Sequence, residues 1–209
     1  MSIISIASRS GWYPDFISPI ADIINSIPLC NFILDWGTGP GTLPSMLIAN
    51  NSDLKAVGLD IDIQAIESAQ KHHSHSNISF LYHKEGVPLN FNDKFFDVVT
   101  FCSVLFLVPE GSRKEMINEA VRLLKPNGKI IVLTPSGQKS VASSLFEVWR
   151  YPFSIRNFTF IIWKIATHRA AGKWKNEKWV EKYASENKLN YSVSTVFNNN
   201  AIVETIAFT

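Results

Sequence analysis

The sequence is poor in cysteine. Its 209 residues include only Cys30 and Cys102, and each lies in an apolar run. Two isolated thiols give no disulfide framework, so we expect both to be buried and reduced, which favours a cytoplasmic protein. No cysteine and histidine residues have the spacing of a metal site, and we therefore expect no metal.

Long apolar runs are also absent. The most apolar stretch of the C-terminal third, Phe158 to Ile165, contains Lys164 and is far shorter than the ~20 residues of a membrane span. The first eight residues have no basic start, so we expect no signal peptide. The chain has no repeats and no low-complexity linker, and its length suits a single domain over residues 1–209.

An excess of charge of one sign is missing too, since 20 basic and 18 acidic residues leave a formal net charge of +2. This weak charge argues against nucleic acid as a general partner. The charge is nevertheless uneven. Residues 145–182 contain eight Lys or Arg and three Glu, a balance of +5, which leaves −3 for the rest of the chain. This segment is also rich in aromatic residues.

Apolar runs typical of buried strands alternate with stretches of helical periodicity. We predict strands at 32–36, 55–60, 78–82, 96–101 and 129–134. We predict helices at 41–50, 63–72 and 112–125, the last one ended by Pro126-Asn127-Gly128. Such alternation implies right-handed crossovers and a mostly parallel sheet.

The pattern changes after residue 137. We predict helices within 139–150, 157–170 and 175–188, and then strands at 191–197 and 201–208. Three asparagines join these two strands, and because asparagine tolerates positive φ they indicate a tight hairpin. The predicted fold is α/β, a doubly wound Rossmann-like seven-stranded sheet that is mostly parallel, with a C-terminal antiparallel hairpin and helices on both faces.

A glycine-rich segment, Asp35-Trp36-Gly37-Thr38-Gly39-Pro40-Gly41, follows the first predicted strand. Its glycines permit a sharp turn and let a ligand approach the main chain. A dinucleotide site would have Gly-x-Gly-x-x-Gly spacing, and Asp35 would repel a diphosphate but attract an amino-acid ammonium group. Asp60 ends the second strand, where it can accept hydrogen bonds from a ribose. Together these carboxylates favour S-adenosylmethionine over a dinucleotide or a turn without ligand.

Four segments, in order, resemble motifs of the class I S-adenosylmethionine-dependent methyltransferases. They are Ile33–Gly41, Val57–Asp60, Leu89–Val99 and Leu123–Lys129. The resemblance covers about residues 30–137, and Trp36 departs from it because the family has a small aliphatic residue there. It implies S-adenosylmethionine as donor, S-adenosylhomocysteine as product, and donor contacts from Asp35, Gly37, Thr38, Gly39, Gly41, Asp60, Ile61, Glu85, Gly86, Phe101 and Cys102.

The resemblance also divides the domain. Residues 1–30 would be an N-terminal cap, 30–137 the donor-binding core, 138–188 a helical lid on the acceptor side, and 189–209 the C-terminal hairpin. Methyl transfer from a sulfonium mainly needs alignment and exclusion of water, so a catalytic base is not required, and we identify none. Many amine methylases carry Asn/Asp-Pro-Pro-Tyr/Phe after the fourth strand, whereas this chain has Cys102-Ser103-Val104-Leu105.

The acceptor side is defined less sharply. We expect residues 10–14, just before the first helix, and the aromatic and basic segment 145–182 to form it. Candidate substrate residues are Trp12, Tyr13, Phe106, Trp149, Tyr151 and Phe153. For residues 145–182 the alternatives to a lid are packing helices, contact with a membrane surface and nucleic-acid binding.

The predicted function is S-adenosylmethionine-dependent methyl transfer to a small molecule of apolar or aromatic character. The alternatives are a methyltransferase that acts on tRNA or protein, and a non-catalytic S-adenosylmethionine-binding protein.

Overall fold

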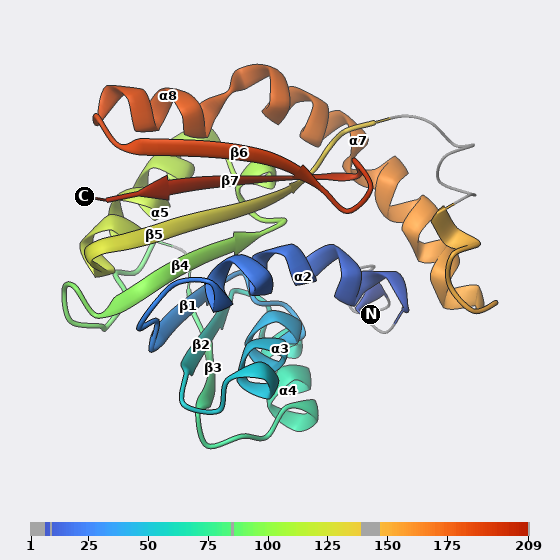
Figure 1. Ribbon diagram of the computed structural model, residues 1–209, viewed down its shortest axis with the longest axis horizontal. Helices are drawn as coiled ribbons and strands as arrows, with labels where there is room; N and C mark the ends of the chain where they lie inside the picture. Colours follow the sequence, from blue (N-terminus) through green and yellow to red (C-terminus); the bar gives the residue numbers. More distant parts are fainter. Residues whose placement is uncertain (1–6, 9, 85, 139–146, 209) are drawn as a thin grey trace.

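A seven-stranded sheet forms the centre of the structure, a computed structural model that describes residues 7, 8, 10–84, 86–138 and 147–208 (Figure 1). The strands are β1 (Phe32–Trp36), β2 (Lys55–Asp60), β3 (Ile78–Tyr82), β4 (Phe96–Cys102), β5 (Leu124–Pro135), β6 (Asn190–Val196) and β7 (Ala201–Ala207). Their order is β3-β2-β1-β4-β5-β7-β6. The first five run parallel, and β7 pairs antiparallel with both β5 and β6. The predicted fold class is thus confirmed.

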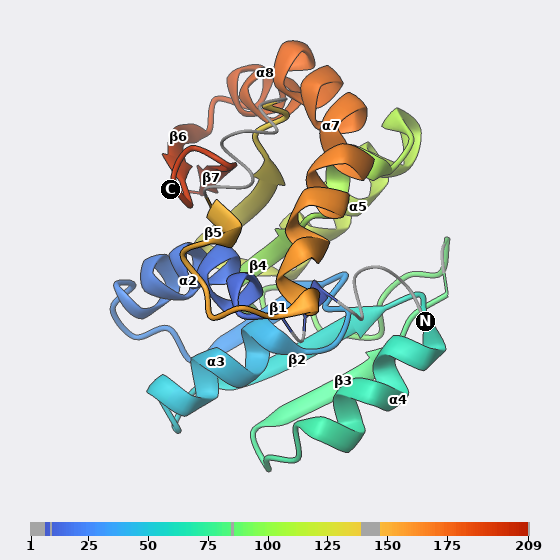
Figure 2. The same ribbon diagram turned by 90° about the vertical axis from the view of Figure 1, so that its right-hand side faces the viewer.

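Helices cover both faces of the sheet (Figure 2). They are α2 (Trp12–Asn25), α3 (Thr42–Asn50), α4 (Ile63–His72), η1 (Leu105–Leu107), α5 (Glu110–Leu123), η2 (Ile155–Phe158), α7 (Thr159–Glu177) and α8 (Trp179–Glu186). One apolar cluster lies between the sheet and α2 and α3, and a second lies between the sheet and α5 and α8. Alternate residues of the strands contribute to the two clusters; in β1, for example, Ile33 belongs to the first and Leu34 to the second.

Helix α7 crosses from one face of the sheet to the other. It does so at the edge where the parallel strands have their carboxyl ends. Phe160 and Trp163 pack in the first apolar cluster, whereas Ala171 and Trp174 pack in the second. The crossing is close, because a Cβ on Gly137 would lie 2.8 Å from the backbone nitrogen of Gly172. The carboxyl end of β5 and the η1 turn after β4 therefore lie against a helix, at the edge where ligands bind in such folds.

The helical segments differ from the prediction in their boundaries. Helices at 157–170 and 175–188 were expected, but α7 is continuous to Glu177 and the break falls at Lys178, whose φ is 49°. Residues 10–14 were expected before the first helix, whereas Trp12 already begins α2. The helix predicted within 139–150 lies largely outside the described residues. In the described part of the chain, no helix is long and apolar enough to cross a bilayer.

Trp12 is the centre of the first apolar cluster. It is fully buried, and its Nε1 donates a hydrogen bond of 3.1 Å to Thr159 Oγ1. The rings of Phe160 and Trp163 lie 5.4 and 5.2 Å from its ring, and further rings of the cluster contact it at Tyr13, Phe16 and Phe197. Trp12 therefore fastens α2 to α7, two elements far apart in the sequence.

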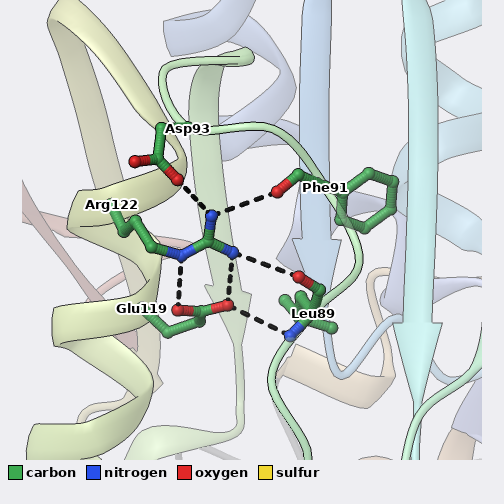
Figure 3. A network of polar contacts seen from close by, with 5 residues as sticks. All are labelled: Leu89, Phe91, Asp93, Glu119 and Arg122. Atoms are coloured by element: carbon green, nitrogen blue, oxygen red, sulfur yellow. Dashed lines mark hydrogen bonds and ion pairs between the residues drawn. The ribbon is translucent and has the colours of Figure 1, made fainter.

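A polar network fixes the segment between β3 and β4. Arg122 on α5 donates to the carbonyl oxygens of Leu89 and Phe91, both at 3.1 Å, and to the carboxylates of Glu119 and Asp93 (Figure 3). Glu119 in turn accepts a bond of 3.1 Å from the Leu89 amide. The hydrogen bond from Arg122 lowers the pKa of Glu119, so this pair stays ionised at neutral pH. The guanidinium thus holds the segment that leads from β3 into β4 against α5.

Candidate functional site

The glycine-rich segment forms a tight loop between β1 and α3. Gly37, Gly39 and Gly41 have φ values of 83°, 54° and 79°, a region that residues with a Cβ rarely adopt. The amides of Gly37 and Thr38 both donate to the carbonyl of Leu59 at 2.8 Å, which ties the loop to the end of β2. A Cβ on Gly37 would lie 2.2 Å from Val104 Cγ2, so the loop also packs directly on the chain that follows β4.

Asp35 lies at the base of this loop and is almost completely buried, with 1% of its surface exposed. Thr100 Oγ1 on β4 donates a hydrogen bond of 2.7 Å to Asp35 Oδ1. Burial raises the pKa of Asp35 to about 6, although the bond from Thr100 favours the ionised form. No lysine, arginine or histidine within the described ranges forms an ion pair with it. A buried carboxylate without a cation is suited to bind one.

Asp60 holds the other side of the loop. Its Oδ2 accepts a hydrogen bond of 2.7 Å from the Gly39 amide, and its Oδ1 accepts one of 2.9 Å from the Asp62 amide. Each oxygen keeps a lone pair that no described residue uses, so the carboxylate can accept further bonds from a diol. Ile61, next to it, is 62% exposed and offers apolar surface beside the acid.

Tyr13, in the first turn of α2, lies near these acids. Its pKa is raised by burial and then by the proximity of Cys102, Asp35 and Asp60, so its hydroxyl is neutral at physiological pH. Burial, followed by the charge of Asp35, also raises the pKa of Cys102 well above its usual value. Cys102 is therefore a thiol and not a nucleophilic thiolate. The start of α2 thus lies beside the acids of the loop, and a covering role for residues 10–14 stays a prediction.

Trp36 finds its space on the α5 side of the sheet. It stacks on Phe101 with ring centres 5.6 Å apart, and His83 meets its edge at 5.7 Å. Burial lowers the pKa of His83, so this imidazole is neutral at pH 7. The sequence marks Trp36 only as a departure from the family pattern, and the structure shows that its ring lines the second apolar cluster beneath the loop.

The other residues predicted to contact the methyl donor differ in whether the structure places them near the loop. Cys102 lies two residues after Thr100 on β4, close to Asp35. Phe101 is completely buried behind Trp36 and presents no surface to a ligand. Gly86 has a φ of 76° and open space where a Cβ would point, whereas Glu85 lies outside the described residues.

The structure does not gather the predicted substrate residues in one place. Trp12 and Phe106 are buried in the two separate apolar clusters. Trp149 and Phe153 are 83% and 92% exposed and belong to the outer surface. Of the six, Tyr13 lies beside the acids of the loop, and Tyr151 donates a bond of 2.8 Å to Asp15 on α2.

Four buried hydroxyl groups at the carboxyl edge went unnoticed in the sequence. Among the described residues, Thr38 Oγ1, Ser103 Oγ, Thr134 Oγ1 and Ser136 Oγ have no hydrogen-bond partner. Thr38, Ser103 and Ser136 follow β1, β4 and β5, and Thr134 is near the end of β5, so all lie where the parallel strands end. Buried polar groups normally have partners, and unpaired ones gathered at one edge indicate a place for a ligand. Serine and threonine are too common in turns for this signal to be read from sequence.

The arrangement therefore combines a bare loop, a buried carboxylate, a second carboxylate with free lone pairs and unpaired hydroxyls. These groups fit the ammonium and ribose of an amino-acid nucleoside better than a diphosphate, which would face Asp35. No group of three or more His, Cys, Asp or Glu residues in the described part of the chain is placed to hold a metal ion.

Comparisons with known proteins agree with this geometry. Residues 33–128 match the model of a family described as "Methyltransferase domain". A tRNA1(Val) (adenine(37)-N6)-methyltransferase of Vibrio vulnificus is 36% identical over 73 residues, which cover 34% of this chain and 30% of that protein. The matched stretch thus spans less than a third of that relative.

Solved structures match over nearly the whole chain. A SAM-dependent methyltransferase from Aquifex aeolicus has a TM-score of 0.69 and 13% identity, with all of both chains covered. The plantazolicin methyltransferase BamL, solved with a triazolic desmethylPZN analog and SAH, has a TM-score of 0.71 and 14% identity, covering 99% of this chain and 89% of that one. Residues 33–128 thus match a methyltransferase domain, and nearly the whole chain shares the fold of these solved methyltransferases.

Proposed function

We propose that the protein binds S-adenosylmethionine and transfers its methyl group to a small-molecule acceptor. The observation that carries the proposal is Asp35, a buried carboxylate without a cation at the base of a positive-φ glycine loop. A dinucleotide would bring two phosphates to that loop, and their charge would be repelled. The donor instead brings an ammonium group to this end.

Each part of the loop has a role in this proposal. Asp35 binds the ammonium, and Asp60 accepts hydrogen bonds from the ribose hydroxyls while it holds Gly39 in place. Ile61, next to Asp60, is exposed and offers apolar surface to the base, and a contact from Gly86 stays a prediction. Glu85, whose role rests on the family resemblance, stays a prediction.

The chemistry asks little of the protein beyond binding and orientation. The donor, when bound, supplies an activated methyl on a sulfonium, and the chain must align the acceptor and exclude water. Tyr13 at the start of α2 lies near the acids of the loop, and α7 packs against both apolar clusters at this edge, so we expect both elements to shield it from solvent. We identify no general base.

The chain after β4 favours a small molecule over an adenine amine in tRNA. In place of Asn/Asp-Pro-Pro-Tyr/Phe it has Cys102-Ser103-Val104-Leu105, and the Leu105 side chain is completely buried. Such a segment offers no carboxamide to hold an exocyclic amine. The partial similarity to a tRNA methylase nevertheless makes tRNA the acceptor to test beside small molecules.

The identity of the donor and the class of the acceptor can be tested in two successive experiments. By calorimetry, we expect S-adenosylhomocysteine to bind and NAD to give no heat. Labelled donor should then transfer its methyl to an organic-solvent extract of cells and leave a purified tRNA fraction unlabelled. Tight NAD binding without a response to the donor would refute the cofactor assignment, and label in tRNA alone would refute the small-molecule acceptor.

Asp60 offers a test of where the donor lies. We expect Asp60→Ala to weaken donor binding by ~1–3 kcal/mol, because charged hydrogen bonds to the ribose and to Gly39 are lost. Asp62→Ala is the matched control, since Asp62 is two residues away and caps α4 through the Gln64 amide at 2.9 Å. It should lower stability by about 1 kcal/mol and leave donor affinity unchanged. Equal loss of affinity in both variants would contradict the assignment.

A further inference from the structure

Large apolar side chains project into solvent from the segment before α7 and from the outer face of its first half. Trp149, Phe153 and Ile155 are 83%, 92% and 84% exposed. We name the whole set the apolar tip, and it consists of Trp149, Phe153, Ile155, Phe158, Ile162 and Ile165. Figure 1 shows η2 and the start of α7 at one end of the molecule's long axis.

Only the inner side of α7 packs against the rest of the described chain. Phe160 and Trp163 point inward and are buried, whereas Phe158, Ile162 and Ile165 recur at positions i, i+4 and i+7 and share the outer face. Scattered exposed apolar residues are ordinary, but six exposed apolar side chains within residues 149–165, two of which contact each other at Phe153 and Phe158, mark an interaction surface.

The charge around the apolar tip is positive. The sequence has no Asp or Glu between Glu147 and Glu177. Arg156 and Arg169 are exposed and form no ion pair with any described residue. Arg150 lies 3.6 Å from Glu147 and is partly neutralised.

Two acids on other elements hydrogen-bond to uncharged groups of this segment. Asp15 on α2 accepts a bond of 2.8 Å from Tyr151, and Glu204 on β7 accepts one of 2.9 Å from Trp174, so neither is paired with an arginine of the segment. An apolar surface edged by arginines therefore faces the solvent.

We propose that the apolar tip docks on an anionic lipid surface. A tryptophan, phenylalanines and isoleucines can enter the boundary between headgroups and acyl chains while neighbouring arginines contact lipid phosphates. RNA fits less well, because isoleucine side chains offer no ring on which bases stack.

The apolar tip is joined to the start of α2, which carries Tyr13 near the glycine-rich loop. The Gly11 amide donates a bond of 2.8 Å to Asn157 Oδ1, and Trp12 bonds to Thr159. Residues 151–159 are thereby fixed to the start of α2, the turn that carries Tyr13. A protein held to lipid by the apolar tip would have its site beside that surface.

Trp149 makes this docking measurable. Of the six tryptophans it is the exposed one, since Trp12, Trp36, Trp163 and Trp174 are buried and Trp179 is partly buried. We expect vesicles of phosphatidylglycerol and phosphatidylcholine to sediment the protein and to shift its fluorescence to shorter wavelength. Phosphatidylcholine vesicles should bind at least tenfold more weakly, and salt should reduce binding to the anionic vesicles.

Variants separate docking from general adhesion. Phe153→Ser with Ile155→Ser should reduce vesicle binding at least about tenfold, and Arg156→Gln with Arg169→Gln should remove the preference for anionic lipid. Val193→Ser is the matched control, because Val193 is 57% exposed on the edge strand β6. These surface changes should leave the circular dichroism spectrum unchanged.

Several outcomes would overturn the proposal. They are absence of binding to anionic vesicles, equal loss in the Val193→Ser control, and binding to tRNA that the Phe153 and Ile155 substitutions abolish while vesicles do not bind. Docking needs no methyl donor, so its failure is distinguishable from failure of the proposed methyl transfer.

Discussion

Replacing Trp12 with alanine is expected to lower the free energy of unfolding by about 3–5 kcal/mol. The side chain is fully buried, contacts a ring of aromatic residues and donates to Thr159 Oγ1. Its loss would leave a large cavity between α2 and α7 and remove the hydrogen bond to Thr159. Equilibrium unfolding in urea, monitored by circular dichroism, measures the change.

Trp149→Ala is the natural comparison for this variant. The same residue type is removed, but Trp149 is 83% exposed, so the free energy of unfolding should change by less than about 0.5 kcal/mol. Similar losses in the two variants would contradict the packing described for α2 and α7.

The free energy of unfolding of the parent should fall with rising pH relative to that of the Asp35→Asn variant, which is the opposite of the usual effect of an aspartate. Burial raises the pKa of Asp35 from 3.8 to about 6, so the folded state binds a proton more readily than the unfolded state. The contribution of Asp35 to stability is therefore present at low pH and is lost as pH rises through 6. Relative to the asparagine variant, the parent should lose about 2–3 kcal/mol between pH 4 and pH 8.

The same substitution should impair donor binding. The ammonium of the donor needs an ionised carboxylate, so affinity in the parent should rise as pH increases through about 6, the pKa of Asp35. In Asp35→Asn it should be lower by tenfold or more at pH 8 and should lack this dependence. Denaturant titrations and calorimetry across pH 5–8 give both quantities. A variant that is less stable relative to the parent at pH 8 than at pH 4 would refute the burial argument.

The strands of the core could be predicted closely from sequence. β1, β2 and β3 occupy the predicted residues, and β4 extends one residue further. Buried parallel strands appear as short apolar runs between polar turns, and the glycine loop marks the end of β1. The acids of the site were found for the same reason, since a strand end fixes where its last side chain lies.

Features that depend on tertiary contacts were predicted less accurately than the strands. Pro126-Asn127-Gly128 was interpreted as a turn after a helix, whereas β5 already begins at Leu124 beside β4. Separate helices were predicted at 157–170 and 175–188, but α7 is continuous to Glu177, and Gly172 within it lets the helix pass close to Gly137. Sequence periodicity does not distinguish a break from a close approach.

The aromatic residues of the acceptor side show the same limit. Trp12, Trp149 and Tyr151 are equally aromatic in the sequence, yet one is in the core, one is in solvent and one is half-buried against Asp15. Their positions follow from where α7 crosses the sheet, and that crossing depends on contacts between residues far apart in the chain.

The central position of β1 has a consequence for how the chain folds. Ile33 on β1 pairs with Val98 on β4, and Ile131 on β5 pairs with Thr205 on β7, so the middle of the sheet requires the closure of long loops. The β6–β7 hairpin, with Thr195 opposite Ile202, is local and can form early. The donor loop lies at the junction of β1, β2 and β4. We therefore expect ligand binding to appear only in the last, slow phase of refolding, when these distant segments meet.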